Sequence, residues 1–310
     1  MTIVQNFLLY ITTVLIWGST WFVITFQLDV ISPELSVAYR FALAAIILFI
    51  FGFVMKRFNF SEFTLRDHIF VAAQGTFLFC LNYWIFYEAT SYLTSGLVAV
   101  SFSTIIVMNI FNQALFFKKR VDARTVVAAL FGLAGIGLVF RPEIQTLSFE
   151  SDAVIGLGLC LIATFLASVG NMAAIRNSNA GLPITDVNAL GMGYGAIIMV
   201  VIALFKGSEF TFDPSFDYIW SLIYLAVLGS IVAFGCYLTL ISRIGADKGA
   251  YAAVLFPIVA LALSTVFEGY IWTPEALIGV GFIIGGNMLV LAPKSIIRKL
   301  FWPKENAVVK

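Results

Sequence analysis

One basic residue lies well inside a long apolar stretch of this sequence. Arg40 is about six residues into the stretch 34–55. An Arg at the centre of a membrane-spanning helix costs about 2.5–3.5 kcal/mol on insertion scales, and less near the helix ends. We therefore expect Arg40 to pair with Glu88 or Glu268, which lie at the ends of two other apolar stretches, and to act as a gate on one side. Two alternatives are a carboxylate-binding group and a side chain that anchors at the membrane interface.

Aromatic residues recur at helical spacing. Trp17 and Trp21 are four residues apart, and Tyr83 belongs to a second stripe with Phe79 and Tyr87. Residues four apart share one face of a helix. We expect Trp17, Trp21 and Tyr83 to line a pathway for an apolar or aromatic solute. The alternative is helix packing or an interfacial aromatic belt.

A polar stripe runs along the stretch 153–175. Thr164, Ser168 and Asn171 follow one another at spacings of four and three residues. Polar side chains in a membrane face the interior of the bundle. Asn171 is the predicted contact for a polar part of the solute, with a hydrogen bond between helices as the alternative. A structural role is favoured for the other polar positions, Asn82, Asn109, Asn112 and Gln113.

Backbone chemistry points to one hinge and two packing motifs. Pro257 lies within an apolar stretch, where it predicts a kink and a free carbonyl group. It is the candidate hinge. The segments 191–195 and 281–285 each contain G-x-x-x-G, which lets two helices approach closely. We expect them to pack within the bundle, and a homodimer face is the alternative.

Several kinds of chemistry lack their sequence signatures. The chain has no G-x-x-x-x-G-K-[ST], no H-E-x-x-H and no G-x-S-x-G motif. The single histidine, His68, and three scattered cysteines offer no metal site. We therefore expect no cofactor and no metal. A net charge of +1 gives no reason to expect a nucleic-acid partner.

Composition places these residues in membrane-spanning helices. Of 310 residues, 61% are hydrophobic and 11% are charged, against about 25% charged in soluble domains. Each apolar stretch has the length needed to cross a hydrocarbon core about 30 Å thick. The sequence predicts an all-α membrane protein with ten transmembrane helices, at 7–28, 34–55, 68–88, 92–117, 123–140, 153–175, 187–205, 217–242, 249–269 and 275–292.

The charges of the connecting loops alternate. If the N-terminus is cytoplasmic, 15 of the 18 Lys and Arg residues fall in inner loops or the C-terminal tail. Only Arg141 and Lys206 fall outside, and Arg40 lies within a helix. Lys and Arg are enriched in cytoplasmic loops. We expect a multi-pass protein of a cell inner membrane with both termini in the cytoplasm.

The second half of the chain echoes the first at a shift of about 150 residues. Segments 87–117 and 240–270 share a polar break, a glycine, a run of small residues and a long apolar helix. Five helices per half is an odd number, so the halves enter the membrane in opposite orientations. We predict two inverted five-helix repeats, at 1–145 and 150–295, followed by a cytoplasmic tail at 296–310. Inverted repeats place a substrate site between them near mid-membrane.

Short motifs in the same order resemble the ten-helix, EamA-type branch of the drug/metabolite transporter superfamily. They are Ile16 to Phe22, Ser32-Pro33-Glu34, Tyr39-Arg40-Phe41, Phe256-Pro257 to Glu268, and Thr273-Pro274 with Gly279 and Gly285-Gly286. The first half departs from the second, because Ser103-Thr104 stands where Pro257 would match and Lys118-Lys119 where Glu268 would match. The resemblance implies a secondary carrier, often an exporter, of amino acids or other small metabolites.

Two other classes remain open from sequence. An intramembrane enzyme acting on lipid or a lipid-linked substrate needs clustered His, Asp, Glu or Cys at one depth, and the chain offers mainly Arg40, Glu88 and Glu268 at one boundary. A sensor or assembly protein is the third. Proton coupling has no mid-membrane acid to demand it, so a facilitator is also compatible with the sequence.

Overall fold

A bundle of helices makes up the computed structural model, which describes residues 3–28, 30–56, 63–118, 120–121, 123–141, 152–244 and 252–291. Within those ranges every regular element is a helix and none is a strand. The first half contains α1 (Ile3–Ile24), α2 (Pro33–Val54), α3 (Leu65–Thr76), α4 (Asn82–Thr90), α5 (Ser95–Phe102), α6 (Ile105–Phe117) and α7 (Ala123–Val139). The second half contains α9 (Asp152–Asn179), α10 (Ile184–Lys206), α11 (Phe216–Ile223), α12 (Ala233–Ile244), α14 (Ala252–Phe267) and α15 (Pro274–Leu291).

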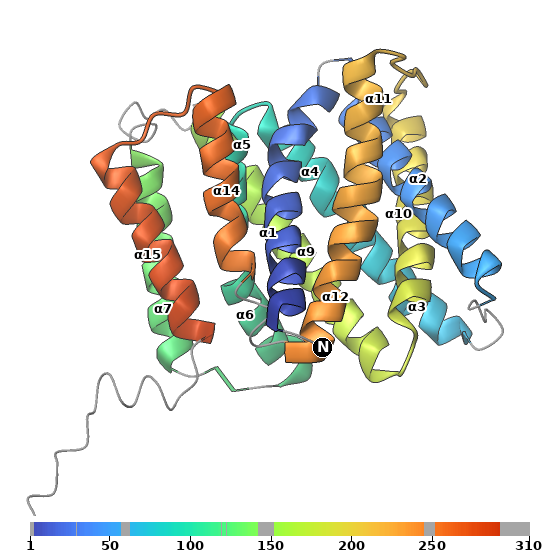
Figure 1. Ribbon diagram of the computed structural model, residues 1–310, viewed down its shortest axis with the longest axis horizontal. Helices are drawn as coiled ribbons and strands as arrows, with labels where there is room; N and C mark the ends of the chain where they lie inside the picture. The colour runs from blue at the N-terminus through green and yellow to red at the C-terminus, as the bar shows by residue number, and fades with distance from the viewer. Residues whose placement is uncertain are drawn as a thin grey trace, which may run out of the picture.

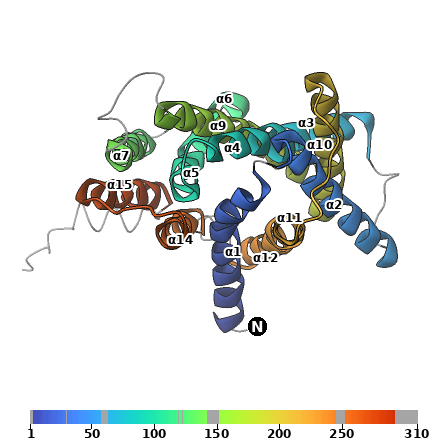
Figure 2. The same ribbon diagram turned by 90° about the horizontal axis from the view of Figure 1, so that it is seen from above.

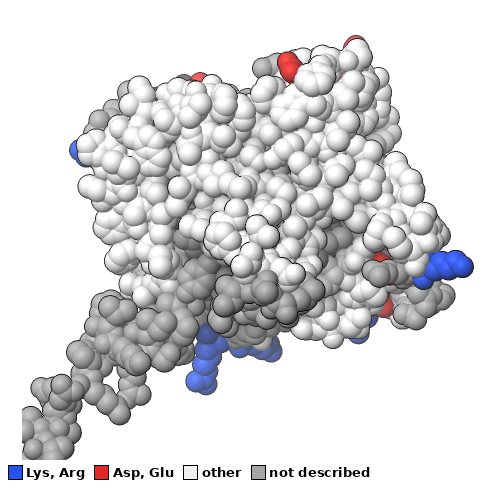
Figure 3. Space-filling model, in the orientation of Figure 1, with Lys and Arg blue, Asp and Glu red and all other residues white. Residues whose placement is uncertain are grey.

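The protein is an all-α, multi-pass membrane protein. Seven helices of the described residues are long and apolar enough to cross a membrane. Three shorter apolar helices, Val126–Val139, Leu255–Phe267 and Pro274–Leu289, lie within the remaining three predicted stretches. Large apolar side chains such as Phe205 and Phe216 are 89% and 80% exposed, as expected for surfaces that face lipid. Figure 3 shows the same property, because charged side chains lie toward the ends of the molecule and an uncharged belt lies between them.

Local chemistry sets where several helices begin and end. Pro33 occupies the first turn of α2, where its missing N–H has no helical partner to lose. The side chains of Thr64 and Asp67 form a capping box at the start of α3. Gly207 ends α10 in the left-handed region, at φ 70°, which glycine adopts without a steric penalty.

Two long helices contain a wide, π-type segment. Segment η3 (Phe77–Leu81) joins α3 to α4, and η4 (Tyr224–Val232) joins α11 to α12. A π segment disturbs the regular i to i−4 hydrogen bonding and often occurs at functional sites. In η4, the Ser230 hydroxyl accordingly donates to the Leu225 carbonyl over 3.0 Å, five residues back.

Helices from the two halves pack against each other along two glycine seams. In the first, α7 lies along α15 at one end of the bundle (Figure 1). A methyl group on Gly135 would lie 2.6 Å from the Gly279 carbonyl oxygen, and one on Gly279 would lie 2.5 Å from the Gly135 oxygen. In the second seam, Gly75 of α3 lies directly against the Gly191 carbonyl of α10. Only glycine permits backbones to approach so closely.

The G-x-x-x-G motifs have different outcomes. Gly191 and Gly195 pack within the bundle against α3 and η3, as predicted. Gly281 and Gly285 were expected to do the same, but neither has an atom of another helix within 4 Å of its Cβ position. Gly279 and Gly286 contact α7 instead. The motif in α15 therefore lies on a different face of the helix from the seam. The seam is formed by Gly279 and Gly286, which are seven residues apart rather than four.

Between the seams the helices form two groups. Seen from above, α1, α12 and α14 lie on one side, and α4, α6 and α9 lie on the other (Figure 2). Helices α2, α3 and α10 close one flank, and α7 and α15 lie at the opposite end. Two buried apolar clusters join the groups, one centred on α2, η3 and α10 and the other on α5, α7 and α9.

Candidate functional site

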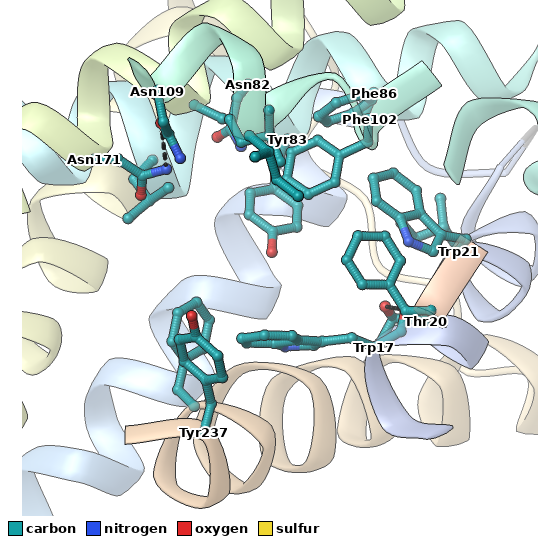
Figure 4. A pocket seen from close by; sticks show the side chains of 17 residues that line it. Trp17, Thr20, Trp21, Asn82, Tyr83, Phe86, Phe102, Asn109, Asn171 and Tyr237 are labelled. Carbon is teal, nitrogen blue, oxygen red and sulfur yellow. Dashed lines mark hydrogen bonds between the residues drawn. The ribbon is translucent and has the colours of Figure 1, made fainter. Parts of the chain in front are cut away.

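A cavity of about 250 Å³ lies between the two groups of helices. We call it the central cavity. Many of its lining residues are aromatic, namely Trp17, Trp21, Tyr83, Phe86, Phe102, Phe234, Tyr237 and Phe256. Three amides, Asn82, Asn109 and Asn171, complete its polar side, and none of its described lining residues is charged. Figure 4 shows the amides on one side and the rings of Trp17 and Tyr237 on the other.

Trp17 is held by η4 and α12. Its indole N–H donates to the Gly229 carbonyl over 3.2 Å. Its ring lies 5.2 Å from the ring of Phe234 and 5.1 Å from that of Tyr237, measured between centroids. Aromatic pairs at such distances contribute about 0.5–1.5 kcal/mol beyond their buried area. The π segment therefore supplies an acceptor that fixes one wall of the central cavity.

Trp21 belongs to a second aromatic group. Its ring meets Phe86 edge to face at 5.1 Å and Phe102 at 5.4 Å. Phe256 of α14 lies 6.5 Å away in a stacked orientation. Because these rings come from α1, α4, α5 and α14, a relative movement of those helices would change the shape of the cavity.

On the amide side of the cavity, two of the amides are hydrogen-bonded to each other, and the third has a side-chain oxygen without a partner. Asn171 donates to the Asn109 side-chain oxygen over 3.1 Å. Asn82 is 3% exposed, and its side-chain oxygen has no hydrogen-bond partner in the structure. A buried polar atom without a partner costs about 1–3 kcal/mol. The cavity therefore offers polar groups that a solute could satisfy.

Four of the five predicted pathway residues line the central cavity: Trp17, Trp21, Tyr83 and Asn171. The fifth, Arg40, lies behind the wall. Its guanidinium carbon is 4.5 Å from the centroid of the Tyr83 ring. Sequence reasoning assigned Asn82 and Asn109 to structural roles, but both line the cavity. Asn109 and Asn112 are three residues apart on α6, yet Asn112 donates to Ser168 and only Asn109 lines the cavity, so residue spacing gave no signal that separates them.

The predicted ion pair is not present in this conformation. Among the described residues, Arg40 is paired with no carboxylate, and its Nε donates to Ser230 over 3.3 Å. Glu88 accepts from Trp84 and lies 4.0 Å from Lys206. Glu268 accepts from the backbone and side chain of Ser95 at the start of α5. Pairing of Arg40 with either acid in another conformation stays a prediction.

Pro257 lies inside α14, next to the contact between α14 and α1. A methyl group on Gly18 would lie 2.5 Å from Val259 Cβ and 3.0 Å from the Phe256 carbonyl oxygen. The proline thus lies at the point where α14 passes closest to α1. Its role as a hinge stays a prediction.

A second polar cluster ties α3 to α9 and α10, away from the central cavity. Arg176 forms an ion pair with Asp67 at 2.8 Å and stacks on Phe70. Asn177 donates to Gln74, and Gln74 donates to Asn188. His68 lies nearby and shares a hydrogen bond with Tyr194 at 2.7 Å. In the part of the chain that the structure describes, no three His, Cys, Asp or Glu residues are placed to hold a metal ion.

Comparison with known proteins identifies related sequences over nearly the whole chain. The model of the family described as the EamA-like transporter family matches residues 6–141 and 154–292. The uncharacterized inner membrane transporter YedA of Escherichia coli (strain K12) is 27% identical over 290 residues, covering 93% of this chain and 90% of YedA. The protein PagO of Salmonella typhimurium is 22% identical and covers 92% of each chain.

One more relative and one solved structure are also similar to this chain. The uncharacterized transporter YoaV of Bacillus subtilis (strain 168) is 22% identical over 281 residues, covering 90% of this chain and 92% of YoaV. A crystal structure of a protein with 16% sequence identity superposes with a TM-score of 0.68, covering 96% of this chain and 99% of the other. That likeness concerns the fold alone.

Proposed function

Because the chain belongs to the EamA-like transporter family and is a membrane transporter, we propose that it is a secondary carrier that exports a small metabolite, such as an amino acid or a derivative, across a bacterial-type inner membrane. The observation that carries this proposal is the central cavity of about 250 Å³, which lies between helices of both halves. Its size is just below the about 300–1,000 Å³ of pockets for drug-sized ligands. Its rings and amides suit a solute with an apolar body and a polar end.

The proposed mechanism is alternating access between two inverted five-helix repeats. Three observations support it. Equivalent helices of the two halves pack together, since α2 lies against α10 and α7 against α15. The third predicted stretch of each half contains a π segment, η3 or η4. The family match also falls in two ranges, 6–141 and 154–292. Rocking of such halves exposes a site between them to each side in turn.

Transport itself is tested by resistance and by flux. Cells that overproduce the protein are challenged with toxic levels of amino acids and their analogues, and growth is compared with an empty-vector control. Compounds that give resistance are then loaded into proteoliposomes, and their efflux is measured. Efflux above that of protein-free liposomes supports the carrier. No flux for any compound that gave resistance would contradict it.

Orientation and repeat number are tested by reporter fusions. Fusions after Arg66, Lys119 and Lys294 are expected to read cytoplasmic, and fusions near Ser91 and Glu150 to read external. The expectation rests on the concentration of Lys and Arg in alternate loops. A cytoplasmic signal at Ser91 would break the alternation, and the inverted repeat would fail with it.

A further inference from the structure

Arg40 is a buried cation with an unused hydrogen-bond donor. The residue is 1% exposed. Its Nε donates to Ser230, but its Nη1 has no hydrogen-bond partner. No acid among the described residues forms an ion pair with it. A buried charge without a partner is costly, and the cost is usually offset by a counter-ion or by added hydrogen bonds. The Nη1 group of Arg40 therefore lacks an acceptor.

Gln27, which lies near Arg40, also has a hydrogen-bond donor without a partner. It is fully buried, and its side-chain oxygen accepts from the Tyr87 hydroxyl over 2.8 Å. Its Nε2 has no hydrogen-bond partner. The Arg40 guanidinium lies beside the same Tyr87 hydroxyl. Two unpaired N–H donors, Arg40 Nη1 and Gln27 Nε2, thus belong to side chains that both lie beside the Tyr87 hydroxyl. The group that would satisfy both is an anion, and a carboxylate has the oxygen atoms to accept from both.

Only one layer of side chains separates these donors from the central cavity. Tyr83 lines the cavity and also lies 4.5 Å from the Arg40 guanidinium carbon. A methyl group on Gly229 would come within 2.8 Å of Thr20, another lining residue, and within 3.4 Å of Arg40 Nη2. Figure 4 shows the Tyr83 side chain at the wall of the cavity, so a solute would reach the guanidinium only if Tyr83 moved.

The nearest candidate acids of the protein are held elsewhere. Glu34 accepts from Lys206 and from Ser208. Glu88 is bound to Trp84, and Glu268 is bound to Ser95. Each of these three carboxylates thus has its own donors, so among the described residues no acid neutralises the charge of Arg40.

We propose that Arg40 and Gln27 form an anion site, reached from the central cavity past Tyr83, that takes the carboxylate of the transported solute. This inference rests on the proposed function and narrows its substrate class. The solute is a small carboxylate whose apolar body lies among the rings of the cavity. The amides Asn82 and Asn171 contact its remaining polar groups.

Binding to the purified protein tests the site without transport. The probes are 3-phenylpropionate and its neutral amide, 3-phenylpropionamide, which share one apolar body. Thermal unfolding in detergent is followed as each probe is added, with chloride as the small-anion arm. We expect the acid to bind about tenfold more tightly than the amide, as a charged hydrogen bond contributes about this factor. Arg40→Gln should abolish the preference, and Arg40→Lys should keep part of it.

Two further variants make the result specific. Arg141→Gln removes an Arg of an exposed ion pair with Glu275, and it should keep the preference for the acid. Asp29 lies outside the described residues, so Asp29→Asn is included and should also bind like the wild type. Tighter acid binding in Asp29→Asn would identify Asp29 as the resident partner of Arg40 and overturn the proposal.

The remaining outcomes are also decisive. Equal binding of acid and amide, or binding of neither, would overturn the site. If chloride raised the unfolding temperature as much as the acid does, the site would bind an inorganic anion, and the proposal of a carboxylate site would be overturned. Without ligand, Arg40→Gln should unfold at the wild-type temperature or above, because it removes an unpaired charge. A clearly lower temperature would give Arg40 a structural role instead. A protein that binds the acid through Arg40 but moves no solute would contradict only the proposed function.

Discussion

In the seam between α7 and α15, the backbone of each helix fills the space that a methyl group on the other would need. The central cavity, by contrast, keeps about 250 Å³ free between rings and amides. The seams use glycine, where no side chain can rotate. The cavity uses aromatic and amide side chains that come from several helices and can reorient. The difference teaches where this protein is rigid and where it can adapt to a solute.

The largest expected effect tests the rigid side of the comparison. Gly135→Ala places a methyl group against the Gly279 carbonyl oxygen, and overpacking of this kind costs about 1–3 kcal/mol. We expect a lower unfolding temperature and a lower yield of purified protein. Gly132→Ala on the same helix is the control, since no atom lies within 4 Å of its Cβ position. An equal loss in both variants would show that helix composition, and not the seam, sets the stability.

Trp17→Ala tests the adaptable side. It removes a ring that packs on Phe234 and Tyr237 at the cavity wall. If a solute packs on this ring as proposed, loss of the ring should weaken the apparent affinity in transport about tenfold. The amount of protein in the membrane should stay near that of the wild type. Trp17→Phe should be milder, because most of the apolar area remains while the bond to the Gly229 carbonyl is lost. If Trp17→Ala and Tyr83→Ala are well produced and transport is unchanged, these residues have a role in helix packing and not in the pathway.

Asn171→Ala tests the polar side of the cavity wall at a single hydrogen bond. It removes the donor to Asn109 at the cavity wall. If Asn171 also contacts the polar part of the solute as proposed, loss of a hydrogen bond of about 0.5–1.5 kcal/mol should lower the apparent affinity about two- to tenfold. Asn112→Ala is the matched control, because Asn112 is buried, donates to Ser168 and does not line the cavity. It should lower the unfolding temperature and leave affinity unchanged. The reverse pattern would place the polar contact at Asn112.

The smallest effect is expected at the exposed charges near the helix ends. Glu88 and Lys206 are 37% and 44% exposed, and such pairs contribute about 0–1 kcal/mol. Glu88→Gln should therefore transport at nearly the wild-type rate. A strong loss would favour the predicted gate, in which Arg40 pairs with an acid in another conformation. Normal transport in Glu88→Gln, Glu268→Gln and Arg40→Lys together would remove that gate.

Much of the fold could be predicted because its signals are local in sequence. Apolar length marked the positions of the helices, and spacings of four residues brought Trp17, Trp21 and Tyr83 to the central cavity. The family match over residues 6–141 and 154–292 confirms the resemblance read from short motifs.

The misses involve contacts between distant parts of the chain. Lys206 and Glu88 are more than a hundred residues apart, and no local pattern pairs them. The motif at Gly281 and Gly285 has the right spacing, but the rotation of α15 places Gly279 and Gly286 in the seam instead. The widening of η4 has no residue signature either, although it positions the carbonyl that holds Trp17. Side-chain partners across helices depend on helix rotation, which residue spacing does not determine.

The separation of glycine seams from the cavity wall also bears on how such proteins diversify. A substitution in a seam is expected to disturb the fold itself, because the two backbones leave no room for a side chain. A substitution among the rings or amides changes what fits inside while the scaffold persists. Relatives only 22–27% identical cover 90% or more of this chain. Proteins with this fold can thus come to bind a different solute through a few substitutions in the cavity wall, without a change of fold.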